Sequence, residues 1–168
     1  MEFIWTPWRY QYVATVDKKT DCVFCRLPSE GDDRNNLILL RARLNYIVMN
    51  LYPYSSGHIM VVPFHHEASL AALDAETTHE MIELAKHAQR VLEAEYHPHG
   101  FNIGWNLGKA AGAGVQEHNH LHIVPRWHGD ANFVSVLGET RILPEDLHAT
   151  YDKLVKPLHQ PPWTSAIS

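Results

Sequence analysis

Three histidines alternate with other residues in the stretch EHNHLHIVPRW, residues 117 to 127. A period of two is the period of a β-strand, so His118, His120 and His122 are predicted to share one face while Asn119 and Leu121 share the other. Imidazole can bind a metal ion or act as a nucleophile near neutral pH. A row of three histidines therefore indicates a metal-binding or catalytic site. The alternative is that the three side chains simply face solvent on an edge strand and have no function.

A single metal ion bound by all three histidines is disfavoured by geometry. On a straight strand the Cα atoms of His118 and His122 would lie roughly 13 Å apart, at about 3.3 Å per residue. Zinc holds its nitrogen ligands at about 2.1 Å, so three imidazoles of one strand converge poorly on one ion. Nucleophilic catalysis fits the row better, because one imidazole can attack phosphorus while its neighbours orient it and bind phosphate oxygens.

The elements that position these histidines are predicted from periodicity and turn residues. Strands are expected at 37–41, 46–50, 58–63, 101–108 and 116–125, and a short further strand around 133–136. A long helix is expected at 74–96, capped by Asp74, and a terminal helix is expected to begin near Pro144. The pattern predicts an α+β fold with a mostly antiparallel five-stranded sheet, one long helix and a C-terminal helix.

The composition is that of a globular protein, with 168 residues of which 45% are hydrophobic and 20% charged. The net charge of −5 gives no basic footprint for nucleic acid. Since no uninterrupted apolar segment predicts a signal peptide or a membrane span, we expect no membrane partner and a cytoplasmic location. The isolated histidines are interpreted as surface residues: His79, His87, His148 and His159.

No linker or internal repeat divides the chain, so residues 1–168 are expected to form a single domain. Within it we distinguish an N-terminal segment (1–36), a catalytic core (37–137) and a C-terminal helix and tail (138–168).

The two cysteines, Cys22 and Cys25, stand in the motif CVFC. Two cysteines are too few for a disulfide scaffold, but Cys-x-x-Cys supplies two zinc ligands and requires two more. A redox pair is an alternative, although such motifs usually open a helix after a strand in a βαβ unit, and that pattern is absent here. Two unligated thiols are the remaining alternative.

A glycine-containing loop, AGAG at 111–114, precedes the histidines. Glycine lacks a Cβ, so backbone N–H groups in this loop can approach a phosphate closely. The stretch GKAAGAG is not a Walker A loop, because no Lys-Ser/Thr pair closes it.

The triad and the hairpin upstream of it resemble the histidine triad (HIT) family. EHNHLHIVP is similar to the family signature, and IVMNLYPYSSGHIMVVP is similar to its hairpin, in which an asparagine precedes a Gly-His pair. CVFC resembles the zinc half-site of many bacterial members. WTPWRYQYV and PRWHGDANF are similar to the branch of diadenosine tetraphosphate phosphorylases or hydrolases. The resemblance covers about residues 5 to 137 and implies an HIT-like fold and a homodimer joined through its sheets.

The resemblance implies a role for each site residue. His120 would be the nucleophile that attacks the α-phosphorus and forms a nucleotidyl-histidine intermediate. His122 would lie beside the transferred phosphate, supported by His58. Asn50 would bind the ribose, and Asn106 would contact the scissile region.

One stretch of the substrate-binding loop departs from the family. Many members carry Gly-Gln-Ser/Thr-Val before the triad, where the hydroxyl helps to protonate an amine leaving group. In the stretch from Gly112 to Gln116, Gly114 and Val115 stand in place of the glutamine and the hydroxyl residue. A polyphosphate leaving group has less need of a proton donor, so a dinucleoside polyphosphate is the expected substrate.

The resemblance also implies a complete ligand set for a structural zinc ion. The set consists of Cys22, Cys25, His66 and His118, with His65 as a competitor for its neighbour's place. His118 would then leave the histidine row to bind zinc, while His120 and His122 serve the phosphate.

The expected function is that of a nucleotidyl hydrolase or transferase that cleaves dinucleoside polyphosphates of the diadenosine tetraphosphate type through His120. Phosphorolysis and hydrolysis differ only in the acceptor, and the sequence leaves both open. The alternatives are a nucleoside phosphoramidate hydrolase, a nucleotide-binding module with little turnover, and a hydrolase with a metal-bound water at His120 or His122.

Overall fold

The computed structural model describes residues 22–130 and 145–163. Its helices are α2 (Val23–Ser29), α3 (Ala75–Tyr96) and α5 (Leu147–Leu158). Its strands are β1 (Ile38–Arg41), β2 (Asn45–Met49), β3 (Ile59–Pro63), β4 (Gly100–Trp105) and β5 (Leu121–Arg126). Two short 3-10 turns are η1 (Leu70–Ala72) and η2 (Lys109–Ala111). None of the helices in the described ranges is long and apolar enough to span a membrane.

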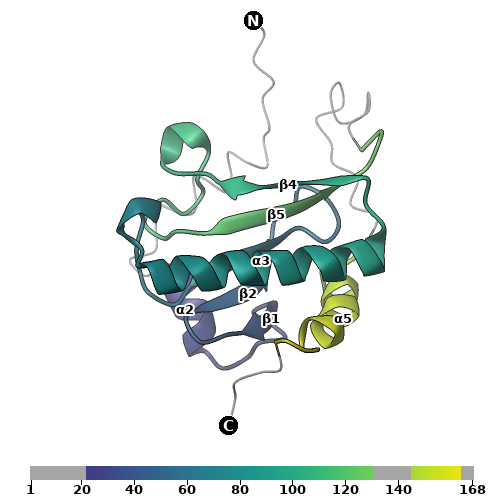
Figure 1. Cartoon of the computed structure of the whole chain (residues 1–168), viewed down its shortest axis with the longest axis horizontal. Helices are drawn as coiled ribbons and strands as arrows, with labels where there is room; N and C mark the ends of the chain where they lie inside the picture. The colour runs from purple at the N-terminus through teal and green to yellow at the C-terminus, as the bar shows by residue number, and fades with distance from the viewer. Residues whose placement is uncertain (1–21, 131–144, 164–168) are drawn as a thin grey trace, which may run out of the picture.

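The five strands form one sheet in the order β1-β2-β3-β5-β4, and every neighbouring pair is antiparallel (Figure 1). Strand β5, which carries His122, is therefore an inner strand. His122 faces Met60 of β3 on one side and Gly104 of β4 on the other in the register of the sheet. The predicted α+β fold with a five-stranded antiparallel sheet is confirmed.

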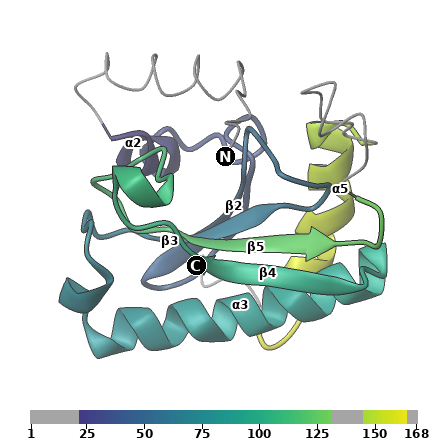
Figure 2. The same cartoon turned by 90° about the horizontal axis from the view of Figure 1, so that it is seen from above.

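Each face of the sheet carries its own apolar cluster. Residues such as Ile59, Leu121 and Ile123 pack with α3 and α5 on one face. On the opposite face, Tyr46 and Met60 pack with Phe24 of α2 in a second cluster. Figure 2 shows α3 and α2 on opposite sides of the sheet. His122 shares its face with Met60, so the histidines lie on the α2 side.

Helix α3 matches the prediction closely. Its first turn is capped by Asp74, whose carboxylate accepts a hydrogen bond of 2.8 Å from the Thr77 N–H. The predicted surface position of His87 is wrong. Its side chain is buried, and its Nε2 lies 2.9 Å from the Leu158 carbonyl of α5. The ring therefore links the two helices that cover this face.

Two predicted strands are longer than the observed ones. The strand expected at 116–125 begins only at Leu121, because the Asn119 N–H donates to the Glu67 carbonyl at 2.6 Å instead of joining the sheet. The strand expected to reach 108 ends at Trp105 and is followed by η2, after Gly108 with a φ of +79°. His118 and His120 consequently precede the strand that carries His122.

The helical predictions also differ at the ends of the chain. Helix α2 was not predicted, since CVFC was followed by an expected loop. Helix α5 begins at Leu147, where the Asp146 side chain caps it. The predicted start near Pro144 and the predicted strand at 133–136 lie outside the described residues.

Candidate functional site

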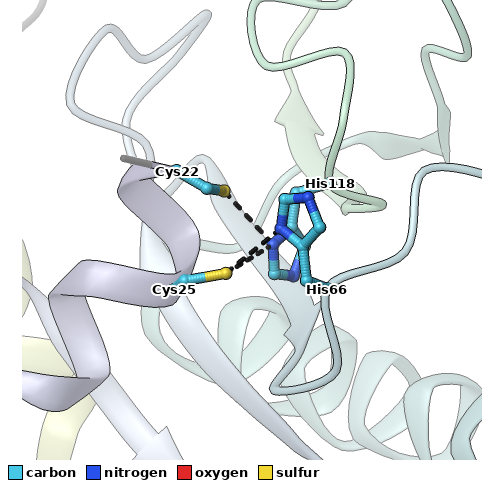
Figure 3. A group of neighbouring side chains, drawn as sticks. All are labelled: Cys22, Cys25, His66 and His118. Carbon is cyan, nitrogen blue, oxygen red and sulfur yellow. Dashed lines mark hydrogen bonds between the residues drawn. The ribbon is translucent and has the colours of Figure 1, made fainter. Parts of the chain in front are cut away.

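Four potential zinc ligands converge beneath α2. The ligand atoms of Cys22, Cys25, His66 and His118 all lie within 4.8 Å of one another (Figure 3). The His118 Nδ1 lies 3.3 Å from the Cys22 sulfur and 3.5 Å from the Cys25 sulfur, and the His66 Nδ1 lies 3.2 Å from the Cys25 sulfur. Tetrahedral zinc requires a sulfur–nitrogen separation of about 3.6 Å. The spacing therefore fits zinc, and His66 rather than His65 belongs to the group.

Local structure explains why these atoms meet. Helix α2 begins after Cys22, whose carbonyl accepts from the backbone N–H groups of Cys25 and Arg26 at 3.1 and 3.0 Å. Residues three apart lie on the same side of a helical turn, so both sulfurs point the same way. The His118 Nε2 lies 2.8 Å from the Pro63 carbonyl, which can only accept. Its hydrogen is therefore on Nε2, and the Nδ1 lone pair faces the sulfurs.

The electrostatics of the group also suit a cation. Burial lowers the pKa of His118 to about 4, which keeps the imidazole neutral and able to coordinate. Burial and the neighbouring Cys22 sulfur raise the pKa of Cys25 to about 11, so the protein alone disfavours the Cys25 thiolate. A divalent ion reverses that preference, because cysteine binds zinc as the thiolate. The donor set is compatible with structural zinc.

His120 is buried and forms a hydrogen bond through one of its two ring nitrogens. Its Nδ1 lies 2.8 Å from the His118 carbonyl, so Nδ1 carries the hydrogen and Nε2 keeps its lone pair. Burial lowers the pKa of His120, which leaves the ring neutral near pH 7. The Phe24 ring packs against it with a centroid separation of 5.0 Å. The His120 ring is thus held in one orientation, with the Nε2 lone pair unprotonated.

His58 and His122 form a second imidazole pair beside His120. The His58 Nε2 lies 3.0 Å from the His122 Nδ1, and the rings of His120 and His122 lie 4.8 Å apart. Both members of the pair are buried. Burial, and to a smaller degree His120, lowers the pKa of His122 to about 4. The buried Nε2 of His122 has no hydrogen-bond partner among the described residues.

Asn50 lies next to this pair, at the end of β2. Its backbone N–H donates to the His58 carbonyl at 3.1 Å, and its side-chain oxygen accepts from the Tyr52 N–H at 2.9 Å. Asn106 is half-buried directly after β4. In the ranges that the structure describes, no hydrogen bond joins Asn106 to the histidines.

The loop before the triad is only partly exposed. Gly112 and Gly114 are half-buried, whereas Gln116 is exposed. Val115 is buried in the same apolar cluster as Phe24. The loop therefore packs on the α2 side of the sheet, the side that carries the histidines.

Sequence reasoning missed two aromatic residues of the site, Phe24 and Tyr54. Phe24 lies between the two cysteines, packs against His118 and His120, and accepts a hydrogen bond of 2.8 Å from the Tyr46 hydroxyl at its carbonyl. Tyr54 packs against His58 with a centroid separation of 4.7 Å. The CVFC spacing, read as a helical turn, would have indicated Phe24, and Tyr54 lies within the hairpin that resembles the family's.

The chain is similar in sequence and structure to several known proteins. A family model described as the HIT domain matches residues 33–129. A protein of Mycobacterium tuberculosis (strain ATCC 25618 / H37Rv), named AP-4-A phosphorylase, is 38% identical over 157 residues, which cover 89% of this chain and 80% of the relative. An adenosine 5'-monophosphoramidase of Schizosaccharomyces pombe is 28% identical over 105 residues, which cover 62% of this chain and 74% of the relative. The solved structure of a zinc-bound histidine triad family protein from Mycobacterium smegmatis superposes with a TM-score of 0.67 at 28% identity, and the match covers 82% of this chain and 93% of that one.

Proposed function

Because the chain belongs to the HIT domain family, we propose that it cleaves dinucleoside polyphosphates of the diadenosine tetraphosphate type through His120. The observation that carries the proposal is the state of His120, a neutral buried ring whose Nδ1 donates to a carbonyl and whose Nε2 lone pair is free to attack. The similarity to an AP-4-A phosphorylase over most of the chain supports this substrate class.

The proposed reaction has two displacements at phosphorus. The His120 Nε2 lone pair forms a bond to the α-phosphorus, and the bond from phosphorus to the bridging oxygen breaks, with its electron pair leaving on the polyphosphate. Orthophosphate or water then attacks the same phosphorus, and the phosphorus–nitrogen bond breaks to restore the imidazole. His122 and His58 stand beside the transferred phosphate, and Asn50 binds the ribose.

Zinc has a structural role in this proposal. Cys22, Cys25, His66 and His118 would hold it, and it would fix α2 to the residue that lies two positions before His120. The ion supplies no step of the reaction. The zinc-bound relative from Mycobacterium smegmatis supports zinc as the metal.

A nucleoside phosphoramidate is the second candidate substrate, and the relative from Schizosaccharomyces pombe favours it. An amine leaves poorly without a proton. Val115 stands where many family members carry a hydroxyl, and its side chain is apolar and buried. We therefore place the polyphosphate first.

The test is incubation of the zinc-loaded protein with diadenosine tetraphosphate, with and without orthophosphate, followed by separation of the nucleotides. ADP and ATP formed only with phosphate identify a phosphorylase, and AMP and ATP formed without it identify a hydrolase. His120→Ala should abolish turnover, whereas His79→Ala, at an exposed position on α3, should not. Absence of product from the wild type contradicts the proposal, and AMP binding without turnover would indicate a binding module.

The homodimer and the cytoplasmic location stay predictions. Strand β4 lies at the edge of the sheet and exposes Ile103, which supports pairing with a second copy. Sedimentation of the wild type and of Ile103→Lys tests the dimer, because a lysine on this edge should produce a monomer. A wild-type monomer at micromolar concentration would contradict it.

A further inference from the structure

The turn between β2 and β3 brings Tyr54 against the imidazole pair in two ways. Its backbone N–H donates to the His58 Nδ1 at 3.0 Å. Its ring packs on His58 at 4.7 Å and stacks toward His122 at 6.1 Å with an interplanar angle of 23°. Tyr54 therefore packs beside both imidazoles of the pair.

The turn that carries Tyr54 is fixed to the rest of the protein. The Ser55 hydroxyl donates to the Pro125 carbonyl of β5 at 2.7 Å, and the His58 N–H donates to the Ser55 carbonyl at 3.2 Å. Gly57 has a φ of +75°, and a Cβ at this position would lie 3.0 Å from Leu92 of α3. Because the turn is anchored to both a strand and a helix, the Tyr54 N–H has a fixed position relative to His58.

This fixed donor determines where the hydrogens of the imidazole pair lie. A backbone N–H can only donate, so the His58 Nδ1 must accept and the His58 hydrogen must be on Nε2. His58 Nε2 then donates to the His122 Nδ1 at 3.0 Å, which places the His122 hydrogen on its Nε2. The opposite tautomers would leave the His58 Nδ1 hydrogen directed at the Tyr54 N–H.

The consequence appears at the end of this chain of hydrogen bonds. The buried His122 Nε2, which has no partner in the described part of the chain, presents a hydrogen rather than a lone pair. An N–H group stabilises an anionic phosphate oxygen, whereas a lone pair repels it. The Tyr54 N–H, acting through His58, therefore determines whether His122 attracts or repels a phosphate oxygen.

We propose that Tyr54 is a positioning residue, which uses its N–H and its ring to hold His58 and His122 in the tautomers that present a hydrogen to the substrate phosphate. The Tyr54 N–H selects the tautomer of His58. The Tyr54 ring keeps both imidazoles in the orientation in which His58 Nε2 can donate to His122 Nδ1. The inference rests on the proposed function only in naming phosphate as the group that receives the hydrogen.

The first experiment reads the tautomers directly. In the zinc-loaded full chain with ¹⁵N-labelled histidine, long-range ¹H–¹⁵N spectra show which ring nitrogen carries the hydrogen. We expect Nε2 for both His58 and His122, and the same result for Tyr54→Phe. A wild-type His122 with its hydrogen on Nδ1 overturns the proposal without any variant.

Variants then separate the two contacts of Tyr54. Tyr54→Pro removes the N–H and should populate the opposite tautomer of His58, whereas Tyr54→Ala keeps the N–H and the tautomer. Tyr54→Ala should lower kcat about three- to tenfold, as expected for a lost aromatic contact, and change KM by less than about twofold. Tyr54→Phe should match the wild type. An unchanged kcat in Tyr54→Ala overturns the role of the ring.

A double-mutant cycle tests whether Tyr54 acts through His58. In a His58→Ala background, Tyr54→Ala should cause a smaller further loss of kcat than in the wild type, because only the contact of its ring with His122 remains, and an equal additional loss overturns the coupling. A second readout does not need turnover. Added AMP should shift the signal of the His122 Nε2 hydrogen in the spectrum of the wild type. A wild type with these spectra and no cleavage of diadenosine tetraphosphate would refute the proposed function and leave the role of Tyr54 standing.

Discussion

Replacement of Phe24 should show that the packing of α2 controls both stability and His120. The side chain is only 6% exposed, and its ring lies 5.6 Å from His118 and 5.0 Å from His120. A buried Phe→Ala change costs about 3–5 kcal/mol. Natural domains have free energies of unfolding of about 5–15 kcal/mol, so Phe24→Ala should remove a large part of the total.

Phe24→Leu separates the two effects of this ring. Leucine keeps most of the apolar volume, so the loss of stability should be about 1–3 kcal/mol, smaller than that of Phe24→Ala. It removes the aromatic contacts with the two imidazoles, each worth about 0.5–1.5 kcal/mol. Because His120 then has more freedom, kcat should fall further than the stability loss alone would cause.

Urea unfolding of the zinc-loaded protein measures the free energy of unfolding of each variant, and atomic emission spectroscopy measures its zinc content. Val23→Ala is the matched control, since Val23 lies in the same helix and packs on the same cluster without a ring contact to the histidines in the described structure. Phe24→Ala with the wild-type free energy of unfolding would refute the reasoning about packing. Phe24→Leu with the wild-type kcat would refute the link to His120.

Three further outcomes follow from individual contacts. Cys22→Ser removes one zinc ligand and should lower zinc content, melting temperature and activity together, and unchanged values of all three count against the site. Gly57→Ala should lower the free energy of unfolding in urea by about 2 kcal/mol, because its φ of +75° disfavours a Cβ and that Cβ would also press on Leu92. Gly31→Ala is the control: its φ is +70° but no atom lies within 4 Å of the added Cβ, so it should show only the cost of the positive φ. The pKa of His87 lies below its ordinary value because burial disfavours the charged ring, an effect that the Leu158 carbonyl opposes. Below about pH 6.5 the unfolded chain therefore binds more protons at His87 than the folded chain does. The contribution of neutral His87 to the free energy of unfolding is complete above that pH and declines below it by up to about 1.4 kcal/mol per pH unit. His87→Gln should make this acid decline shallower, and an identical slope in urea unfolding from pH 7 to 5 would contradict the assignment.

The strand period predicted that His120 and His122 lie close together, and their rings are 4.8 Å apart although His120 precedes the strand. It did not predict the path of His118, because that path depends on partners remote in sequence. The Glu67 carbonyl draws the Asn119 N–H out of the sheet, and the Pro63 carbonyl fixes the His118 ring. The resemblance to the family, and not the periodicity, indicated that His118 turns toward the cysteines.

Features that depend on tertiary contacts were not predictable in the same way. Helix α2 has seven residues, and isolated helices of that length are marginal in water. The Tyr46 hydroxyl, which donates to the Phe24 carbonyl, and the burial of Phe24 stabilise it. His87 lies within the apolar stripe of α3, and the Leu158 carbonyl, supplied by α5, makes a buried imidazole acceptable there.

The strand order has a consequence for the nascent chain. Strand β4 is synthesised before β5, yet β5 is its only partner among the described strands, and β5 also pairs with β3. A chain that leaves the ribosome can therefore pair β1, β2 and β3 in turn, but β4 must wait until residues 121–126 have emerged. The pairing of β5 with β3 is non-local, and pairing of that kind is slow to form. The last described strand to be made enters between two earlier ones, so the sheet is completed by the same strand that brings His122 beside His58.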